Sequence, residues 1–530
     1  MPQIGQADGQ SPLSPLPIER APMDACCYTV SDIATVDALK SRLAATFSRV
    51  TATVEQSTLE VLDSFDWRLH HHGWQVNRRK DRFEIINRAN GRVISDTLAS
   101  GSARRRFWWD FPPSDFSRHL ENRLAMRALI PMAKIQQRLT RFDVRNQDAK
   151  IVARVAIESL TAAGHPQPVI QCQVTAMGGY PKAFETVTDL VKTLALPPAE
   201  TSPVVALLEK MGAAPGGYSS KINIALPADM PAEAAVRHVL ANLVSTIATN
   251  LPGIEQDIDS EFLHDFRVAV RRARSLLGQF KAVLDPDQTA HLQRLLKSMG
   301  AISGAVRDLD VVLLQKTHYL NRLPECLNPG AVQLFRMLQR KRDRARQRMI
   351  RQMAGRGFKA ALSDLNTFVQ GNPAAALQTP EGARPIMEVA QPVIYNRYRR
   401  IISKGRRISD HTADGALHAL RIQCKKLRYL LEFFASLFPE NQIGLLVKQL
   451  KQLQENLGDF NDLSVQQAFF SCHLETIEPR TEAAVILAAA TGGLIAGLSL
   501  ERKAVRSQFL RVFEAFAQSE NRKRFKQLFT

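Results

Sequence analysis

The sequence has few cysteines, and their spacing is not typical of a disulfide or metal-binding framework. Its 530 residues include six cysteines, with no CxxC pattern and no paired spacing. Cys424 falls on the apolar side of a predicted helix, where a reduced thiol packs as a small hydrophobic group. The cysteine usage therefore predicts a protein of a reducing compartment, and we expect it in the cytoplasm.

Short motifs of the common nucleotide-binding and hydrolytic sites are missing as well. The sequence contains no Walker A, GxGxxG, GxSxG or HExxH pattern. The run His70-His71-His72 would alternate between the two faces of a strand, so its members could not ligate one metal ion together. We therefore expect no metal site, no cofactor and no catalytic residues of these classes.

Long apolar runs are scarce. Met1–Ala21 is rich in Pro, Ser and Gln and lacks the apolar core of a secretory signal, so residues 1–26 are predicted to be a disordered tail. Ala483–Leu500, an Ala/Gly/Leu/Ile run, is at the lower length limit for crossing a bilayer. Because it occupies a helix position of an internal repeat, we interpret it as a buried bundle helix and expect no membrane span.

Positive charge, by contrast, is in excess. Seventy Lys and Arg residues against 51 Asp and Glu residues give a formal net charge of +19. This balance favours polyanionic partners and leaves three open: nucleic acid, inorganic polyphosphate and an anionic membrane surface.

One basic segment occurs twice. Residues 264–277 and 418–431 match position for position, and 154 residues separate His264 from His418. At about 100° per residue, the histidine and three basic residues of each copy fall on one side of a helix, with Arg272 and Lys426 about 100° from the centre of that side, and the apolar residues fall on the other side. Each copy therefore predicts a helix with one face in a core and one face of concentrated positive charge.

Two further predicted helices carry basic residues at i, i+3, i+7 and i+10. These stripes are Lys341, Arg344, Arg348 and Arg351 in one helix, and Arg397, Arg400, Lys404 and Arg407 in the other. A solvated face is the usual explanation of a single stripe. Two basic faces brought together by a repeat, however, would repel each other strongly unless an anion lay between them. Retention of the pattern in both copies indicates a bound polyanion.

Guanidinium and ammonium groups suit phosphate oxygens, so a groove lined by them would bind a linear polyphosphate with little recognition of a base or a sugar. His264 and His418 are either packing residues at helix starts or phosphate contacts. Their matched place on the charged faces favours phosphate contact. We expect both histidines to belong to one cavity between two bundles.

The apolar patterning predicts two kinds of domain. Alternating runs predict an antiparallel α+β domain over residues 27–215. Its candidate strands are Thr51–Asp66, Trp74–Asn87, Gly91–Leu98, Lys150–Leu160 and Val169–Ala176. Beyond Pro231 the spacing is helical almost throughout, so residues 216–530 are predicted to be an all-α domain of two pseudo-symmetric four-helix bundles, with repeats at about 231–370 and 385–530.

The paired His-x-x-Arg-x-x-x-(Arg/Lys)-(Arg/Lys)-x-Arg helices, with Leu-Arg-Tyr-Leu-Leu-Glu at residues 427–432, resemble the hallmark of the CHAD family, the conserved-histidine α-helical domains. The resemblance covers about Met230–Phe516 and implies two four-helix bundles around a basic cavity that binds inorganic polyphosphate. The binding residues that it implies are His264, Arg267, Arg271, Arg272, Arg274, His418, Arg421, Lys425, Lys426 and Arg428. Our predicted supporting residues are Lys341, Arg344, Arg348, Arg397, Arg400 and Lys404.

The segment Asp63-Ser-Phe-Asp66-Trp-Arg-Leu69, followed by Gly73, is similar to a stretch of CYTH domains, which belong to the triphosphate tunnel metalloenzymes. That family needs paired carboxylates to hold a divalent metal against triphosphate. From Met1 to Pro215 the chain has no Asp/Glu pair at i, i+2, so we expect a degenerate, catalytically silent CYTH-like domain. This domain also carries five arginines that could contact a polyanion, although exposed surface charge is the usual explanation of such residues. They are Arg78, Arg79, Arg104, Arg105 and Arg106.

We therefore predict non-catalytic binding of inorganic polyphosphate, with the protein targeted to or organising polyphosphate granules in the cytoplasm and with granule-associated proteins as further partners. Two alternatives stay open. One is a metal-dependent tri- or polyphosphatase in the N-terminal domain. The other is nucleic-acid binding, which the basic-aromatic run at residues 106–109 would also fit.

Overall fold

The structure is a computed structural model, and it describes residues 25–99, 101, 105–371, 379–478 and 480–530. Within these residues the chain divides into two compact units, the first ending at Ser219 and the second spanning Ser220–Thr530. Residues 1–24 of the predicted tail lie outside the described residues. Ala25 and Cys26, which we had assigned to the tail, are instead the first residues of a strand.

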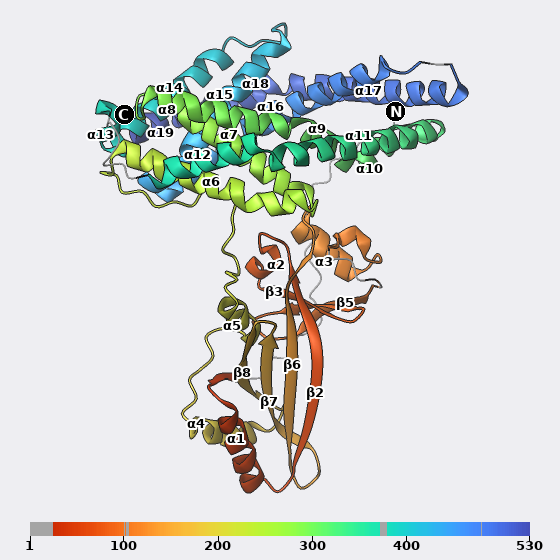
Figure 1. Cartoon of the computed structure of the whole chain (residues 1–530), viewed down its shortest axis with the longest axis vertical. Coiled ribbons are helices and arrows are strands. Elements are labelled where there is room, and N and C mark those ends of the chain that lie inside the picture. The colour runs from red at the N-terminus through yellow and green to blue at the C-terminus, as the bar shows by residue number, and fades with distance from the viewer. Residues whose placement is uncertain (1–24, 100, 102–104, 372–378, 479) are drawn as a thin grey trace. The chain divides into compact units, whose positions relative to one another are not determined.

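The first unit is built on one eight-stranded antiparallel sheet (Figure 1). Its strands are β1 (Ala25–Val30), β2 (Val50–Asp63), β3 (Trp74–Arg79), β4 (Arg82–Asn87), β5 (Val93–Leu98), β6 (Ile130–Arg145), β7 (Ile151–Ala162) and β8 (His165–Ala176). They lie in the order β1-β8-β7-β6-β2-β3-β4-β5. The predicted antiparallel α+β class is confirmed.

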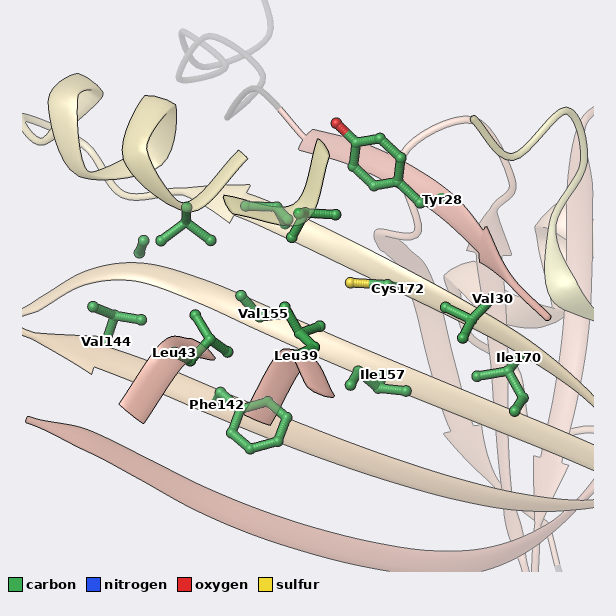
Figure 2. Packing of buried hydrophobic residues seen from close by; sticks show 14 of the residues in the cluster. Tyr28, Val30, Leu39, Leu43, Phe142, Val144, Val155, Ile157, Ile170 and Cys172 are labelled. Atoms are coloured by element: carbon green, nitrogen blue, oxygen red, sulfur yellow. The ribbon is translucent and has the colours of Figure 1, made fainter. Parts of the chain in front are cut away.

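Helices cover the sheet on both faces. On one face, Leu39 and Leu43 of α1 (Ile33–Thr46) pack with strand residues such as Phe142 and Cys172 (Figure 2), and α4 (Pro181–Lys192) joins this core. On the opposite face, α5 (Pro203–Lys210) packs in a core that includes Ile135. Ile135 and Phe142 both lie on β6, an odd number of positions apart, so they point to opposite faces. The other helical segments of this unit are α2 (Arg68–His71), α3 (Asp115–Leu124) and a 3-10 turn at Trp108–Asp110.

The longest strand, β6, was missed in the sequence. Its apolar residues change parity along the strand because Ala133 and Ile135 enter one core and Phe142 and Val144 enter the other. A search for strict alternation cannot follow such a change. The predicted single run Trp74–Asn87 is two strands, which turn at Lys80, a residue with φ of 53°.

The second unit is helical. Its first repeat contains α6 (Ala232–Glu255), α7 (Ser260–Gln279), α8 (Pro286–Ile302), α9 (Gly304–Leu314), α10 (Lys316–Leu320), α11 (Asn328–Ala354) and α12 (Arg356–Gln370). After the short α13 (Pro380–Ala383), its second repeat contains α14 (Ile386–Gly405), α15 (Asp414–Phe433), α16 (Glu440–Leu474), α17 (Glu482–Ser507), α18 (Phe509–Phe516) and α19 (Ser519–Phe529). Helices α6, α7, α8 and α11 each begin 154 residues before α14, α15, α16 and α17.

Residues related by this repeat contact one another, which places an approximate two-fold axis between them. The backbone N–H of Ala232 donates to the carbonyl of Arg384 at 2.9 Å, and the N–H of Ile386 donates to the carbonyl of Met230 at 2.8 Å. Each bond maps onto the other when residue numbers shift by 154. The rings of Phe280 and Phe434, which are equivalent positions, also lie 5.2 Å apart. The predicted pseudo-symmetric all-α architecture is therefore confirmed.

The interpretation of the apolar run Ala483–Leu500 as a buried helix is wrong in part. Among the described residues, one segment, Glu482–Phe516, is long and apolar enough to cross a membrane by length and composition, with a mean hydropathy of 2.0 in its most apolar window. Only 28% of that window is buried. One side of α17 packs against α11 and α16, the 3-10 turn at Glu325–Leu327 packs beside Gly493, and part of the helix stays exposed.

Candidate anion-binding surface

Helix α7 has a start signal and one apolar side. Asp259 precedes it in extended conformation, and its carboxylate accepts hydrogen bonds from the backbone N–H groups of Glu261 at 2.9 Å and Phe262 at 3.3 Å. Phe266 and Val270 are buried one turn apart. Helix α15 has the same arrangement of buried residues. In both helices the burial of this side turns the basic side outward.

The C-terminal halves of α7 and α15 meet at the two-fold axis. Arg272 of α7 donates to the carboxylate of Glu432 of α15 at 2.7 Å. Beside this ion pair, Arg271 lies close to Arg421 and Lys425. Arg271 and Lys425 are equivalent positions of the repeat, so the axis passes between them. We refer to Arg271, Arg421 and Lys425 as the dyad cluster.

The dyad cluster concentrates positive charge. Burial lowers the pKa of Lys425, the cations Arg421 and Arg271 lower it further, and Asp462 opposes them in part, with a resulting pKa of about 8. Within the described residues, neither Arg271 nor Lys425 has a hydrogen-bond or ion-pair partner. The arrangement is unfavourable without an anion, because the ammonium group loses hydration and gains like-charged neighbours.

His264 and His418 lie away from the axis, His264 against α9 and His418 against α16, each within its own repeat. Arg307 donates to Nδ1 of His264 at 2.8 Å, and Nδ1 of His418 lies 2.7 Å from the amide oxygen of Asn461. Because a guanidinium only donates, Nδ1 of His264 is the acceptor in this contact.

The basic surface is elongated. Each histidine is seven residues from the axis-related pair, or about 10 Å along its helix. Helices α7 and α15 run antiparallel where they meet, since Arg272 pairs with Glu432 and Gln279 donates to the carbonyl of Lys426 at 3.4 Å. The two histidines therefore lie toward opposite ends of one surface, and their shared cavity stays a prediction.

Arg267 and Arg421 are partly engaged within their own repeats. Arg267 donates to the carbonyl of Gly300 at 3.0 Å and to the hydroxyl of Ser303 at 2.8 Å. Arg421 donates to the carboxylate of Asp462 at 3.3 Å. A guanidinium has five N–H donors, so each of these side chains retains donors for a ligand.

Glu432 ties the two basic faces together. Its carboxylate accepts from Arg272 at 2.7 Å and from Arg428 at 2.6 Å. Arg272 also donates to the carbonyl of Ser220 at 2.7 Å. Arg272 and Arg428, which we predicted as phosphate contacts, are thus held in structural ion pairs, whereas Arg274 is exposed.

The predicted stripe on α14 lies beside α15. Arg397 donates to the amide oxygen of Gln423 at 2.6 Å. Burial lowers the pKa of Lys426, and Arg397, Arg400 and Lys281 lower it further. These contacts join α14 and α15 into one basic surface, with Lys404 one turn beyond Arg400. Sequence reasoning missed Lys281 because it follows the end of α7 and belongs to no stripe.

The predicted stripe on α11 lies elsewhere. Lys341 lies 6.0 Å from the ring centre of Phe469, in the C-terminal part of α16. Arg344 and Arg348 are exposed on α11. Among the described residues, no recorded contact links this stripe to the dyad cluster, so the structure does not bring the two together.

The acids just before α7 have structural roles. Asp259 caps α7, as described above, and Asp257 accepts from both terminal nitrogens of Arg342, at 2.7 and 2.6 Å. Arg342 also donates to the buried Asp310 at 2.9 Å. This half-buried network fixes α11 against the junction of α6 and α7.

The two carboxylates of the CYTH-like segment, Asp63 and Asp66, bind groups of the first unit itself. Asp63 accepts from the backbone N–H groups of Ser64, Leu69 and His70 at 2.7 to 3.0 Å, and burial raises its pKa to about 6. Asp66 pairs with Arg68 and with the fully buried Arg127. The segment therefore forms a capped turn.

The other candidate residues of the first unit also contact groups within that unit. The run His70-His71-His72 lies in and just after the short helix α2, between the strands β2 and β3. Arg78 pairs with Glu60, and Arg79 pairs with Glu84. Arg106 packs between the rings of Phe83 and Phe111, and Arg104 lies outside the described residues. A search of the described chain finds no group of His, Cys, Asp and Glu that could hold a metal.

The sequence was compared with known families and structures. Residues 238–471 match the CHAD domain. This CHAD region contains α7, α15 and the whole dyad cluster. The two repeated basic helices thus both lie within the region that matches the CHAD domain.

Individual relatives are distant. Two uncharacterized Mycobacterium tuberculosis proteins, MT2285 and Rv2226, are each 24% identical over 267 residues, which cover 48% of this chain and 50% of theirs. The chain thus spans about half the length of these curated relatives. The CHAD domain from the plant Ricinus communis is 25% identical with a TM-score of 0.46, covering 55% of this chain and 95% of that one. PptA from Streptomyces chartreusis is 19% identical with a TM-score of 0.44, covering 54% and 99%.

Proposed function

We propose that the helical unit binds inorganic polyphosphate, without a catalytic step, on the basic surface that crosses the two-fold axis. The observation that carries the proposal is the dyad cluster, in which cations of both repeats meet and Arg271 and Lys425 keep their N–H groups for a ligand. A chain of phosphates supplies closely spaced anionic oxygens, which suit both guanidinium and ammonium groups. The CHAD match supports this substrate class, which is the one that the family resemblance implies.

The surface favours a linear polyanion over a compact one. His264 and His418 lie toward its two ends, and Arg267 and the dyad cluster lie between them. Arg397, Arg400 and Lys426 widen it toward α14. A long phosphate chain would contact several of these groups at once, whereas orthophosphate would contact few.

The test compares two variants that lose the same charge. Fluorescence anisotropy with labelled long-chain polyphosphate at moderate salt should show binding about 100-fold weaker for Arg271→Ala/Lys425→Ala, since each charge-assisted contact contributes about 1.5 kcal/mol or more. The matched control, Lys359→Ala/Lys448→Ala, removes two exposed lysines of α12 and α16 and should bind almost as the wild type. Equal affinities of the two double variants would refute the proposal.

Competition separates polyphosphate from nucleic acid. Duplex DNA at equal phosphate concentration should displace little labelled polyphosphate, because a duplex holds its phosphates on a stiff rod, whereas a polyphosphate chain can bend to follow the basic surface. Full displacement by DNA would assign the surface to nucleic acid instead.

We further propose that the protein acts in the cytoplasm at polyphosphate granules and that its first unit is a silent CYTH-like domain. A fluorescent fusion should associate with granules in cells and lose that association in Arg271→Ala/Lys425→Ala. Granule association that survives this double substitution would point to a granule protein as the anchor.

A further inference from the structure

Helix α17 exposes a narrow stripe over several turns, on the side that faces away from α11 and α16. In order along the helix it consists of Glu482, Val485, Ala489, Gly492, Ala496, Leu500 and Lys503, which we call the α17 stripe. At about 100° per residue these positions fall within roughly 80° of one another. Val485 is 51% exposed and Leu500 is 70% exposed, and a Cβ added at Gly492 would meet no atom within 4 Å. The apolar side chains of the stripe thus face solvent in a single chain.

Another side of α17 is packed within its own chain. Leu487, Leu494 and Leu498 are buried, and a Cβ at Gly330 of α11 would lie 2.4 Å from the carbonyl oxygen of Ile486. The backbones of α11 and α17 therefore approach each other closely. A membrane span would have to separate α17 from these neighbours, of which α11 carries the basic residues described above.

The α17 stripe is complementary to itself when two copies run antiparallel. If the two-fold axis passes between Gly492 and Gly493, residues of similar size face each other across it. Val485 then lies opposite Leu500, and Ala489 lies opposite Ala496. The terminal charges match as well, because Glu482 faces Lys503. Small residues at the centre let two helices approach closely, with larger side chains and a charge pair at each end. A parallel pair would instead place Glu482 opposite Glu482.

We propose that the α17 stripe is a homodimer interface, on which the stripe of a second copy of this chain packs antiparallel. A two-fold contact of this kind is self-complementary and closed, so it gives a dimer without further growth. The contact is about one helix wide, which places it among weak interfaces, with a Kd on the order of micromolar. The dimer would carry two basic surfaces, and a long polyanion that reached both would bind with a gain in avidity.

Sedimentation velocity of the full chain without polyphosphate, from about 1 to 100 μM, tests the proposal independently of the proposed function. We expect a concentration-dependent monomer–dimer equilibrium. Ala489→Glu places two unpaired carboxylates at the centre of the interface and should raise the dimer Kd at least about 100-fold. The matched control is Ala483→Glu, which adds the same charge at an exposed alanine of α17 about 140° from the stripe centre and should leave the Kd within about twofold.

A charge exchange tests the antiparallel register. Glu482→Lys and Lys503→Glu should each raise the Kd about tenfold, because each leaves two like-charged pairs in the dimer, and Glu482→Lys/Lys503→Glu together should restore it. Thermal unfolding of each variant shows whether the fold is kept. A monomer at every concentration, or equal effects of Ala489→Glu and Ala483→Glu, would refute the proposal.

Flotation with lipid vesicles tests the alternative that the α17 stripe contacts a membrane. Flotation with neutral phosphatidylcholine vesicles, which do not attract the basic surfaces, should show no binding by wild type or by Ala489→Glu, because the stripe is covered in the wild-type dimer and carries a carboxylate in the variant. If wild type is monomeric in solution and Ala489→Glu abolishes vesicle binding, the stripe is a membrane contact and the dimer proposal is wrong.

Discussion

Lys425 should make polyphosphate binding depend on pH in a window where few other groups titrate. In the free protein, burial and then Arg421 and Arg271 lower the pKa of Lys425 to about 8, from an ordinary value of 10.5. A bound phosphate chain supplies the missing counter-charge and raises the pKa again. Below pH 8 the ammonium group is charged in both states, so affinity stays constant. Above pH 8 binding has to take up a proton, so affinity falls as the pH rises.

The size of the effect follows from the two pKa values. If bound polyphosphate restores the ordinary pKa, affinity should fall about tenfold between pH 7 and pH 9, because binding is then coupled to the uptake of nearly one proton.

Anisotropy titrations with labelled polyphosphate at constant ionic strength, at half-unit intervals from pH 7 to pH 9.5, measure the dependence. Lys425→Arg keeps the charge at all these pH values and should bind with a flat profile. The conservative control Lys448→Arg, at an exposed position of α16, should keep the wild-type slope. A wild-type profile that is flat, or a Lys425→Arg profile as steep as the wild type, would refute the reasoning.

Three further predictions follow from the same structure. Lys425→Met should raise the melting temperature by about 2–4 °C while weakening polyphosphate binding, because the charged lysine is destabilising in the unliganded cluster; a lower melting temperature in differential scanning calorimetry would contradict this. Glu432→Ala should cost about 2 kcal/mol in denaturant unfolding, since it leaves Arg272 and Arg428 without their shared carboxylate; unchanged stability would show that the bridge is not formed in solution. The full chain with Mg²⁺ or Mn²⁺ should release no orthophosphate from tripolyphosphate, because Asp63 and Asp66 are used within a turn; release above a no-protein blank would revive the phosphatase alternative.

Features that depend on residues close together in the sequence could be predicted from the sequence alone. The 154-residue repeat, the basic face of each copy and the helical class of the second unit all follow from periodicity, which a helix converts directly into a face. The antiparallel class of the first unit follows from alternation and turn signals in the same way. Strand β6 was the exception, because its apolar residues serve two cores on opposite faces and no single alternation describes it.

The partners of each charged group depended on long-range packing. Periodicity placed Arg271 and Arg274 on the basic stripe and Arg272 about 100° from its centre, but it could not say which of them meets a ligand. Only the crossing of α7 with α15 places Arg271 beside Lys425 and engages Arg272 with Glu432. Sequence spacing fixes the direction of a side chain on its own helix, whereas the group that it meets is set by a helix 154 residues away.

The apolar run of α17 shows the same division. Its sequence established a helix with a strong preference for an apolar environment, and the repeat indicated its position in the second bundle. The tertiary structure decided that only one side of it packs within the chain, which leaves Val485 and Leu500 exposed. The physical reason is that hydrophobicity is a property of the residues, whereas burial is a property of the neighbours that the fold supplies.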